Sequence, residues 1–134
     1  MPLKKKRVIL DSNFLMLPFQ FNVDISDEIS RILEGGFKIY VPQEILNELN
    51  YLSIKAEKQK DRKTAKMALE YAKRFATIAG GDGEADEAIV TLAGKDTIVC
   101  TNDKALKNRL REIHVPVIYL RSKSKLEIEG YGVS

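Results

Sequence analysis

The stretch that decides the fold covers residues 7–13 and reads RVILDSN. Its apolar, β-branched part, residues 7–10, predicts a buried strand that stops abruptly at Asp11. Short apolar runs at residues 37–41, 98–101 and 115–120 predict three further strands, and residues 126–131 are a candidate for a fifth.

The segments between these runs carry helical patterns. A helix is expected to begin after Asp24 and to stop at Gly35 and Gly36. Residues 43–79 contain no glycine or proline and are expected to be largely helical, with a break between two helices possible near residues 58–63. Apolar spacing predicts two more helices, over residues 84–93 and 103–113.

This alternation of strands and helices determines the predicted fold class. Strands that are apolar throughout, rather than alternating with polar residues, are typical of a parallel sheet covered on both faces. We therefore predict an α/β protein with three layers, α/β/α, around a central parallel sheet of four to five strands. At 134 residues the chain is expected to form a single domain, residues 1–134.

Composition narrows the class of protein further. A hydrophobic fraction of 44% and a charged fraction of 31% are typical of a globular protein in water. The single cysteine, Cys100, excludes an internal disulfide, and the single histidine, His114, disfavours a histidine-based catalyst. No apolar run is long enough for a membrane span, and the basic start does not resemble a secretory signal, so we expect a cytoplasmic protein.

Acidic residues occur where the predicted strands end. Asp11 follows the first strand and Asp103 follows the third, and a parallel sheet places both at the same edge. Asp86 opens the helix at 84–93, and Glu48 lies on the helix that begins near Pro42. Taken singly, each residue is explained by a helix cap or a surface charge. Together, four clustered carboxylates would repel one another unless they bound protons or hard cations such as Mg²⁺ or Mn²⁺.

The segments that carry these acids resemble the PIN-domain family of metal-dependent ribonucleases from residue 8 to residue 120. Asp11-Ser12-Asn13 is similar to the first motif of the family, and residues 42–49 (PQEILNEL) are similar to the second, with Glu48 at its acidic position. Residues 85–89 (ADEAI) resemble the third motif, and residues 101–103 (TND) resemble the fourth. The third and fourth motifs most resemble PIN endonucleases of small-subunit ribosomal RNA processing; VapC-like toxins come second.

The resemblance implies an endoribonuclease that hydrolyses RNA phosphodiester bonds with water activated by Mg²⁺ or Mn²⁺. Its catalytic and metal-binding residues would be Asp11, Glu48, Asp86 and Asp103. Ser12, Asn13 and Thr101 would support the site. The partners implied are RNA, a ribosomal precursor particle or an antitoxin, and a second copy of the chain in a homodimer; no membrane is implied.

Basic residues concentrate between residues 51 and 80, where eight basic side chains stand against three acidic ones. With the residues that follow Asp103, they form a candidate RNA-binding set: Lys55, Lys58, Arg62, Lys63, Lys66, Lys104 and Lys107. A solvated helix face explains the same pattern, and both interpretations stay open. Tyr51 and Tyr71 are candidates for stacking on bases, although helical spacing favours ordinary packing.

Two other classes of function compete with the nuclease. The first is a non-catalytic RNA-binding or assembly module that keeps the PIN fold, which the retention of all four acids disfavours. The second is a phosphoacceptor signalling domain, which also places acids at the carboxyl edge of a parallel sheet. The acidic motif at Glu48 and the absence of a lysine ending the last strand disfavour it.

Overall fold

The computed structural model describes residues 5–81 and 83–130, in which one or two helices follow each strand up to β4, and β5 and β6 come last. The strands are β1 (Lys6–Leu10), β2 (Phe37–Pro42), β3 (Ala76–Ile78), β4 (Thr97–Cys100), β5 (Val117–Ser122) and β6 (Lys125–Glu129). The helices are α1 (Ser12–Gln20), α2 (Ile25–Ile32), α3 (Gln43–Lys55), α4 (Gln59–Ala72), α5 (Ala85–Leu92) and α6 (Lys104–Glu112).

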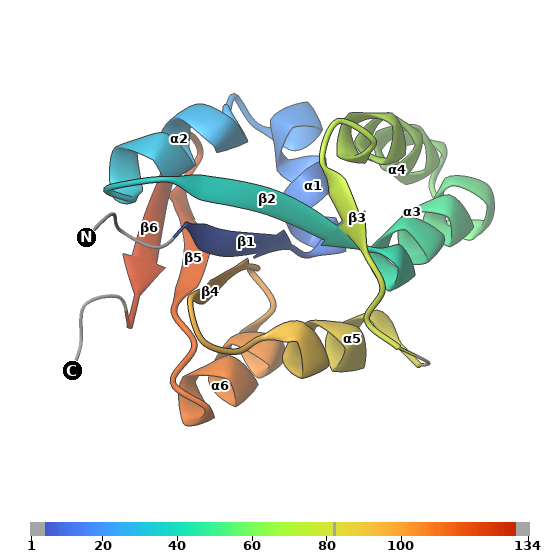
Figure 1. Ribbon diagram of the computed structural model, residues 1–134. Coiled ribbons are helices and arrows are strands. Elements are labelled where there is room, and N and C mark those ends of the chain that lie inside the picture. The colour runs from blue at the N-terminus through green and yellow to red at the C-terminus, as the bar shows by residue number, and fades with distance from the viewer. Residues whose placement is uncertain (1–4, 82, 131–134) are drawn as a thin grey trace.

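The strands form one sheet in the order β3-β2-β1-β4-β5-β6. All neighbours are parallel except β6, which returns antiparallel to β5. As Figure 1 shows, helices α1 to α4 lie on one side of the sheet and α5 and α6 on the other. The predicted three-layer α/β/α class is therefore confirmed. The sheet itself has six strands rather than the predicted four to five, and it is mixed rather than wholly parallel, because β6 returns as a hairpin partner of β5.

The second half of the central strand β1 is completely buried. Val8, Ile9 and Leu10 have no exposed surface, because β2 and β4 flank β1 and helices cover both of its faces. Phe14 of α1 and Ile89 of α5 are equally buried. This core fixes the carboxyl end of β1, from which Asp11 emerges.

Three segments also differ from the sequence predictions in their secondary structure or its bounds. Residues 12–20, for which the sequence pattern predicts no helix, form α1 even though Pro18 lies inside it. The expected helical stretch 43–79 ends at Ala72, and residues 76–78 instead pair with β2 as strand β3. The predicted break between two helices is present but lies earlier, at residues 56–58.

The break between α3 and α4 is held by one side chain. The Arg62 guanidinium donates to the backbone oxygens of Ala56, at 2.6 Å, and Glu57, at 2.9 Å. These are acceptors that the end of α3 leaves without a helical partner. A residue proposed to contact RNA thus has a structural task in the turn.

Side chains of α2 cover the outer edge of β6 at Leu126. The backbone N–H of Leu126 donates to Glu28 Oε1 at 3.0 Å, and its carbonyl accepts from Arg31 Nη2 at 2.8 Å. Glu28 and Arg31 also pair with each other at 3.1 Å. The last residue of the predicted fifth strand, Tyr131, lies outside the described residues.

Candidate active site at the carboxyl edge of the sheet

Asp11 is the most buried of the candidate catalytic residues, with a relative exposure of 3%. It caps the N-terminus of α1, and its Oδ1 accepts a hydrogen bond from the Ser12 N–H at 2.8 Å. Its Oδ2 accepts from the Thr101 hydroxyl at 2.7 Å. Both carboxylate oxygens are therefore held in fixed positions at the end of β1.

Thr101 connects Asp11, at the end of β1, to Asp103, which follows the end of β4. Its Oγ1 donates to Asp11 and accepts from the Asp103 N–H at 3.1 Å. Asp103 in turn caps α6, with Oδ1 accepting from the Leu106 N–H at 2.9 Å. One buried hydroxyl thus aligns the N-termini of α1 and α6 at the same edge, as expected for strands that run parallel.

Glu48 and Asp86 approach this edge from two other helices. Glu48 lies on α3, half-buried, where a hydrogen bond from the Ser12 side chain favours its charged form. Asp86 lies in the first turn of α5, where the helix dipole favours a negative charge. The four predicted acids therefore come from four segments that meet at one edge.

The electrostatics of the site show that these groups influence one another. The pKa of Asp11 is raised from 3.8 to about 6, chiefly by burial. The hydrogen bonds from Thr101 and Ser12 lower this pKa, whereas the charges of Asp86 and Glu48 raise it. Burial also raises the pKa of Glu48, with Asp86 contributing. The pKa of Asp86 is raised by burial first and by Asp103 second. The edge thus holds more negative charge than its own donors neutralise.

The donor set is suited to a hard divalent cation. The converging groups are carboxylate oxygens, the ligands that Mg²⁺ and Mn²⁺ prefer, and a cation would relieve their mutual repulsion. In residues 5–81 and 83–130, however, no three histidine, cysteine or carboxylate residues form a group that could hold one ion. The four carboxylates therefore fit such a cation in residue type and charge, although no three of them are already arranged as a complete set of ligands.

Sequence reasoning missed a contact that positions the loop before α5. Glu44, in the first turn of α3, accepts a hydrogen bond from the Gly80 N–H through Oε1 at 3.2 Å. A side chain at Gly80 would lie only 2.5 Å from Ala88 Cβ, so the loop passes close to α5. The sequence carries one signal for Glu44, its place in the first turn of a helix, where acidic residues are favoured. That signal does not predict the contact with Gly80. Asp82, in the same loop, lies outside the described residues.

The supporting residue Asn13 lies beside the loop that precedes α6. Its side-chain oxygen accepts from the Asn102 N–H at 3.4 Å, while Asn102 accepts from the Leu120 N–H at 2.8 Å. The two asparagines connect the start of α1 to β5. Asn13 therefore orders the strand-end loops.

Comparison with known proteins agrees with this geometry. The sequence profile described as a PIN like domain matches residues 8–123. The chain belongs to this family. Ribonuclease VapC4 of Methanocaldococcus jannaschii is 34% identical over 127 residues, which cover 92% of this chain and 97% of that protein. Ribonuclease VapC9 of Archaeoglobus fulgidus is 26% identical over 128 residues, 94% of this chain and 91% of that protein.

A solved structure agrees with the family assignment. The structure of the PIN domain endonuclease Utp24 superposes with a TM-score of 0.76 at 28% sequence identity, covering 92% of this chain and 90% of that one. The predicted resemblance to the PIN family and the predicted PIN-like fold are both confirmed. Within the described part of the chain, no helix is both long and apolar enough to cross a membrane.

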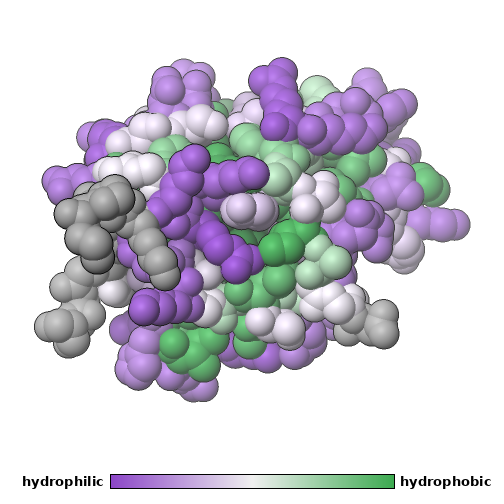
Figure 2. Space-filling view, viewed as in Figure 1, coloured by the Kyte–Doolittle hydropathy of each residue, from purple (hydrophilic) through white to green (hydrophobic). Residues whose placement is uncertain are grey.

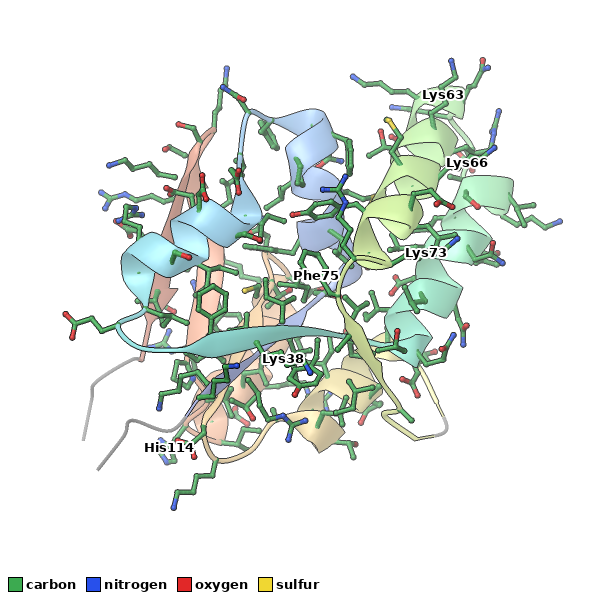
Figure 3. The ribbon with its side chains drawn as sticks, turned by 45° about the horizontal axis from the view of Figure 1, so that its top comes forward. Lys38, Lys63, Lys66, Lys73, Phe75 and His114 are labelled. Carbon is green, nitrogen blue, oxygen red and sulfur yellow. The ribbon has the colours of Figure 1, made fainter. Side chains whose placement is uncertain are left out.

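The candidate RNA-binding residues of this PIN domain differ in their surroundings. Lys63 and Lys66 project from α4 away from the sheet (Figure 3), in a region that Figure 2 shows as hydrophilic. Lys55, Lys58 and Lys104 are also exposed.

Lys107 has a different environment from these exposed lysines. It pairs with Glu129 at 3.2 Å and stacks over the Tyr119 ring, with 4.2 Å between Nζ and the ring centroid. Like Arg62, it has structural contacts that an RNA ligand would have to share.

Proposed function

We propose that this protein is a divalent-metal-dependent endoribonuclease. The carboxyl edge would be its active site, and residues 1–134 would form one PIN-like nuclease domain. Membership of the PIN family supports the enzyme class predicted from sequence, a nuclease of the hydrolase type. RNA as the substrate is supported by two relatives that are named ribonucleases.

The observation that carries the proposal is the buried, negatively charged environment of Asp11. A carboxylate with 3% exposure and two other acids acting on it is costly without a cation. The residues that would hold Mg²⁺ or Mn²⁺ are Asp11, Glu48, Asp86 and Asp103. Such an ion, when bound, activates water and stabilises the leaving oxygen of a phosphodiester.

The residues of the chain would orient this chemistry. Thr101 and the Ser12 N–H hold both oxygens of Asp11, so that its carboxylate cannot turn away from the edge. Asp103 has one oxygen committed to capping α6, and its second oxygen would face a ligand. Ser12 favours the ionised form of Glu48, which a metal ligand must keep. Fixed positions of this kind lower the reorganisation that the reaction requires.

For the biological setting we propose ribosomal RNA processing, on the motif resemblance, with a ribosomal precursor particle as partner. A VapC-like toxin ribonuclease is the second candidate, because two relatives carry the name VapC. It would pair with an antitoxin, and either candidate could act as a homodimer. Expression that arrests growth would favour the toxin; accumulation of unprocessed ribosomal RNA on deletion would favour processing.

Cleavage of end-labelled RNA with Mn²⁺ tests the activity. Wild-type protein should cut the RNA, whereas the Asp103→Asn variant and an EDTA control should not. Asparagine caps a helix as well as aspartate, so this variant should keep its fold. Glu34→Gln, which changes an exposed acid after α2, is the matched control and should cut like wild type. RNA binding without cleavage by metal-loaded protein would instead support the non-catalytic module.

A further inference from the structure

An exposed aromatic ring lies one helical turn from the candidate catalytic acid on α3. Tyr51 follows Glu48 by three residues, which places the two side chains on the same helix face. Tyr51 is 62% exposed, and so is Ile54 one turn further along. Tyr51 lines a cavity to which Ile54 does not contribute, so the two residues form a natural comparison.

The cavity beside Tyr51 has a volume of about 610 Å³ and lies between α3 and the start of α5. Figure 1 shows these two helices flanking the end of β2. The polar and aromatic side chains that line it are Glu44, Asn47, Glu48, Tyr51, Glu84 and Asp86. Glu48 and Asp86 belong also to the candidate active site, so the cavity and the site are continuous.

The chemistry of this lining selects its ligand. Four carboxylates would repel a free phosphate, which excludes an anion as the group bound here without a metal. A planar, neutral ring that carries amino groups fits better, because a tyrosine face stacks on it and carboxylate or amide oxygens accept from its edge. Gln43 donates to the Asn47 side-chain oxygen at 3.0 Å and so fixes the orientation of that amide.

We propose that this cavity is a nucleobase subsite, in which an unpaired base next to the scissile phosphate stacks on Tyr51. The inference rests on the proposed ribonuclease function and adds a residue that binds the substrate. A base stacked inside a duplex cannot reach the tyrosine ring, so the base that stacks on Tyr51 must be unpaired. Tyr51 is then a binding residue that positions the strand.

Kinetics on a single-stranded RNA test the proposal. Tyr51→Ala should lower kcat/KM about 5- to 150-fold, the range that corresponds to loss of one base–aromatic stack. Tyr51→Phe, which keeps the ring, should stay close to wild type. Ile54→Ala, an equally exposed position on the same helix, should also stay close to wild type. Wild-type kinetics for Tyr51→Ala, with cleavage intact, would overturn the subsite and leave the nuclease standing.

Fluorescence tests the subsite without cleavage. The chain contains no tryptophan, so Tyr51→Trp introduces a single reporter. An oligoribonucleotide should quench it, and the same strand made entirely abasic should not; Ile54→Trp should respond to neither. Quenching in a protein that cuts no RNA would support the subsite and refute the nuclease. Equal responses to both strands, or at both positions, would refute stacking.

Discussion

Replacing Asp11 by asparagine should stabilise the metal-free protein at neutral pH, although it removes a candidate catalytic group. The pKa of Asp11 is raised in the folded state from 3.8 to about 6, chiefly by burial. At 1.36 kcal/mol per pKa unit, the ionised carboxylate costs about 3 kcal/mol of folding free energy at pH 7. Asparagine keeps an acceptor for the Ser12 N–H but loses the bond from Thr101, which offsets about 1 kcal/mol. A net gain of about 2 kcal/mol remains.

The stability gained by Asp11→Asn should depend on pH. A carboxyl group with a raised folded-state pKa binds more protons in the folded than in the unfolded protein, so its cost grows as pH rises from about 4 to 6. The cost is complete above pH 6 and absent below the ordinary value of 3.8. The advantage of Asp11→Asn should therefore be largest at neutral pH and vanish near pH 4.

Urea denaturation in EDTA measures this difference. With a dependence of about 1–3 kcal/mol per molar urea, the midpoint of Asp11→Asn should lie about 1–2 M higher than that of wild type at pH 7.5. Glu34→Gln makes the same charge change at an exposed residue and should leave the midpoint nearly unchanged. A lower midpoint for Asp11→Asn at pH 7.5, or an advantage that persists at pH 4, would refute the conclusion that burial makes the Asp11 charge costly.

Three further predictions concern the same edge. Mn²⁺ should raise the melting temperature of wild-type protein and have a much smaller effect on Asp11→Asn, as differential scanning fluorimetry would show; an equal rise in both would remove Asp11 as a ligand. Thr101→Val should cost about 1–3 kcal/mol in urea unfolding, because Asp11 loses a donor and the Asp103 N–H loses its acceptor; a neutral effect would contradict the bridge. Gly80→Ala should cost about 1–3 kcal/mol, since the added carbon would lie 2.5 Å from Ala88 Cβ; unchanged stability would mean that the loop yields freely.

The sequence is sufficient to predict where the acids meet, because that depends only on strand direction. If residues 7–10 and 98–101 are parallel strands, Asp11 and Asp103 must emerge at one edge. The bond through Thr101 agrees with that prediction. Catalytic and metal-binding roles for these residues remain predictions.

Other elements depend on tertiary contacts that a sequence pattern does not contain. Residues 76–78 follow a helix without a glycine or proline, and only pairing with β2 makes them a strand. Pro18 argues against a helix at residues 12–20, because an internal proline removes a helical hydrogen bond. Helix α1 forms nevertheless, since packing of the buried Phe14 and Leu15 offsets that loss. The contact between Glu44 and Gly80 joins residues 36 positions apart and has no local signal.

The covered edge of β6 has a consequence for how the protein behaves in a concentrated solution. Glu28 and Arg31 offer Leu126 an acceptor and a donor, the two groups that the backbone of an additional strand would present. A strand from another molecule would have to displace both side chains before it could pair at this point, and at the opposite edge β3 offers only three residues. At Leu126 the side chains of helix α2 thus take the place of a next strand, which hinders edge-to-edge pairing at that point.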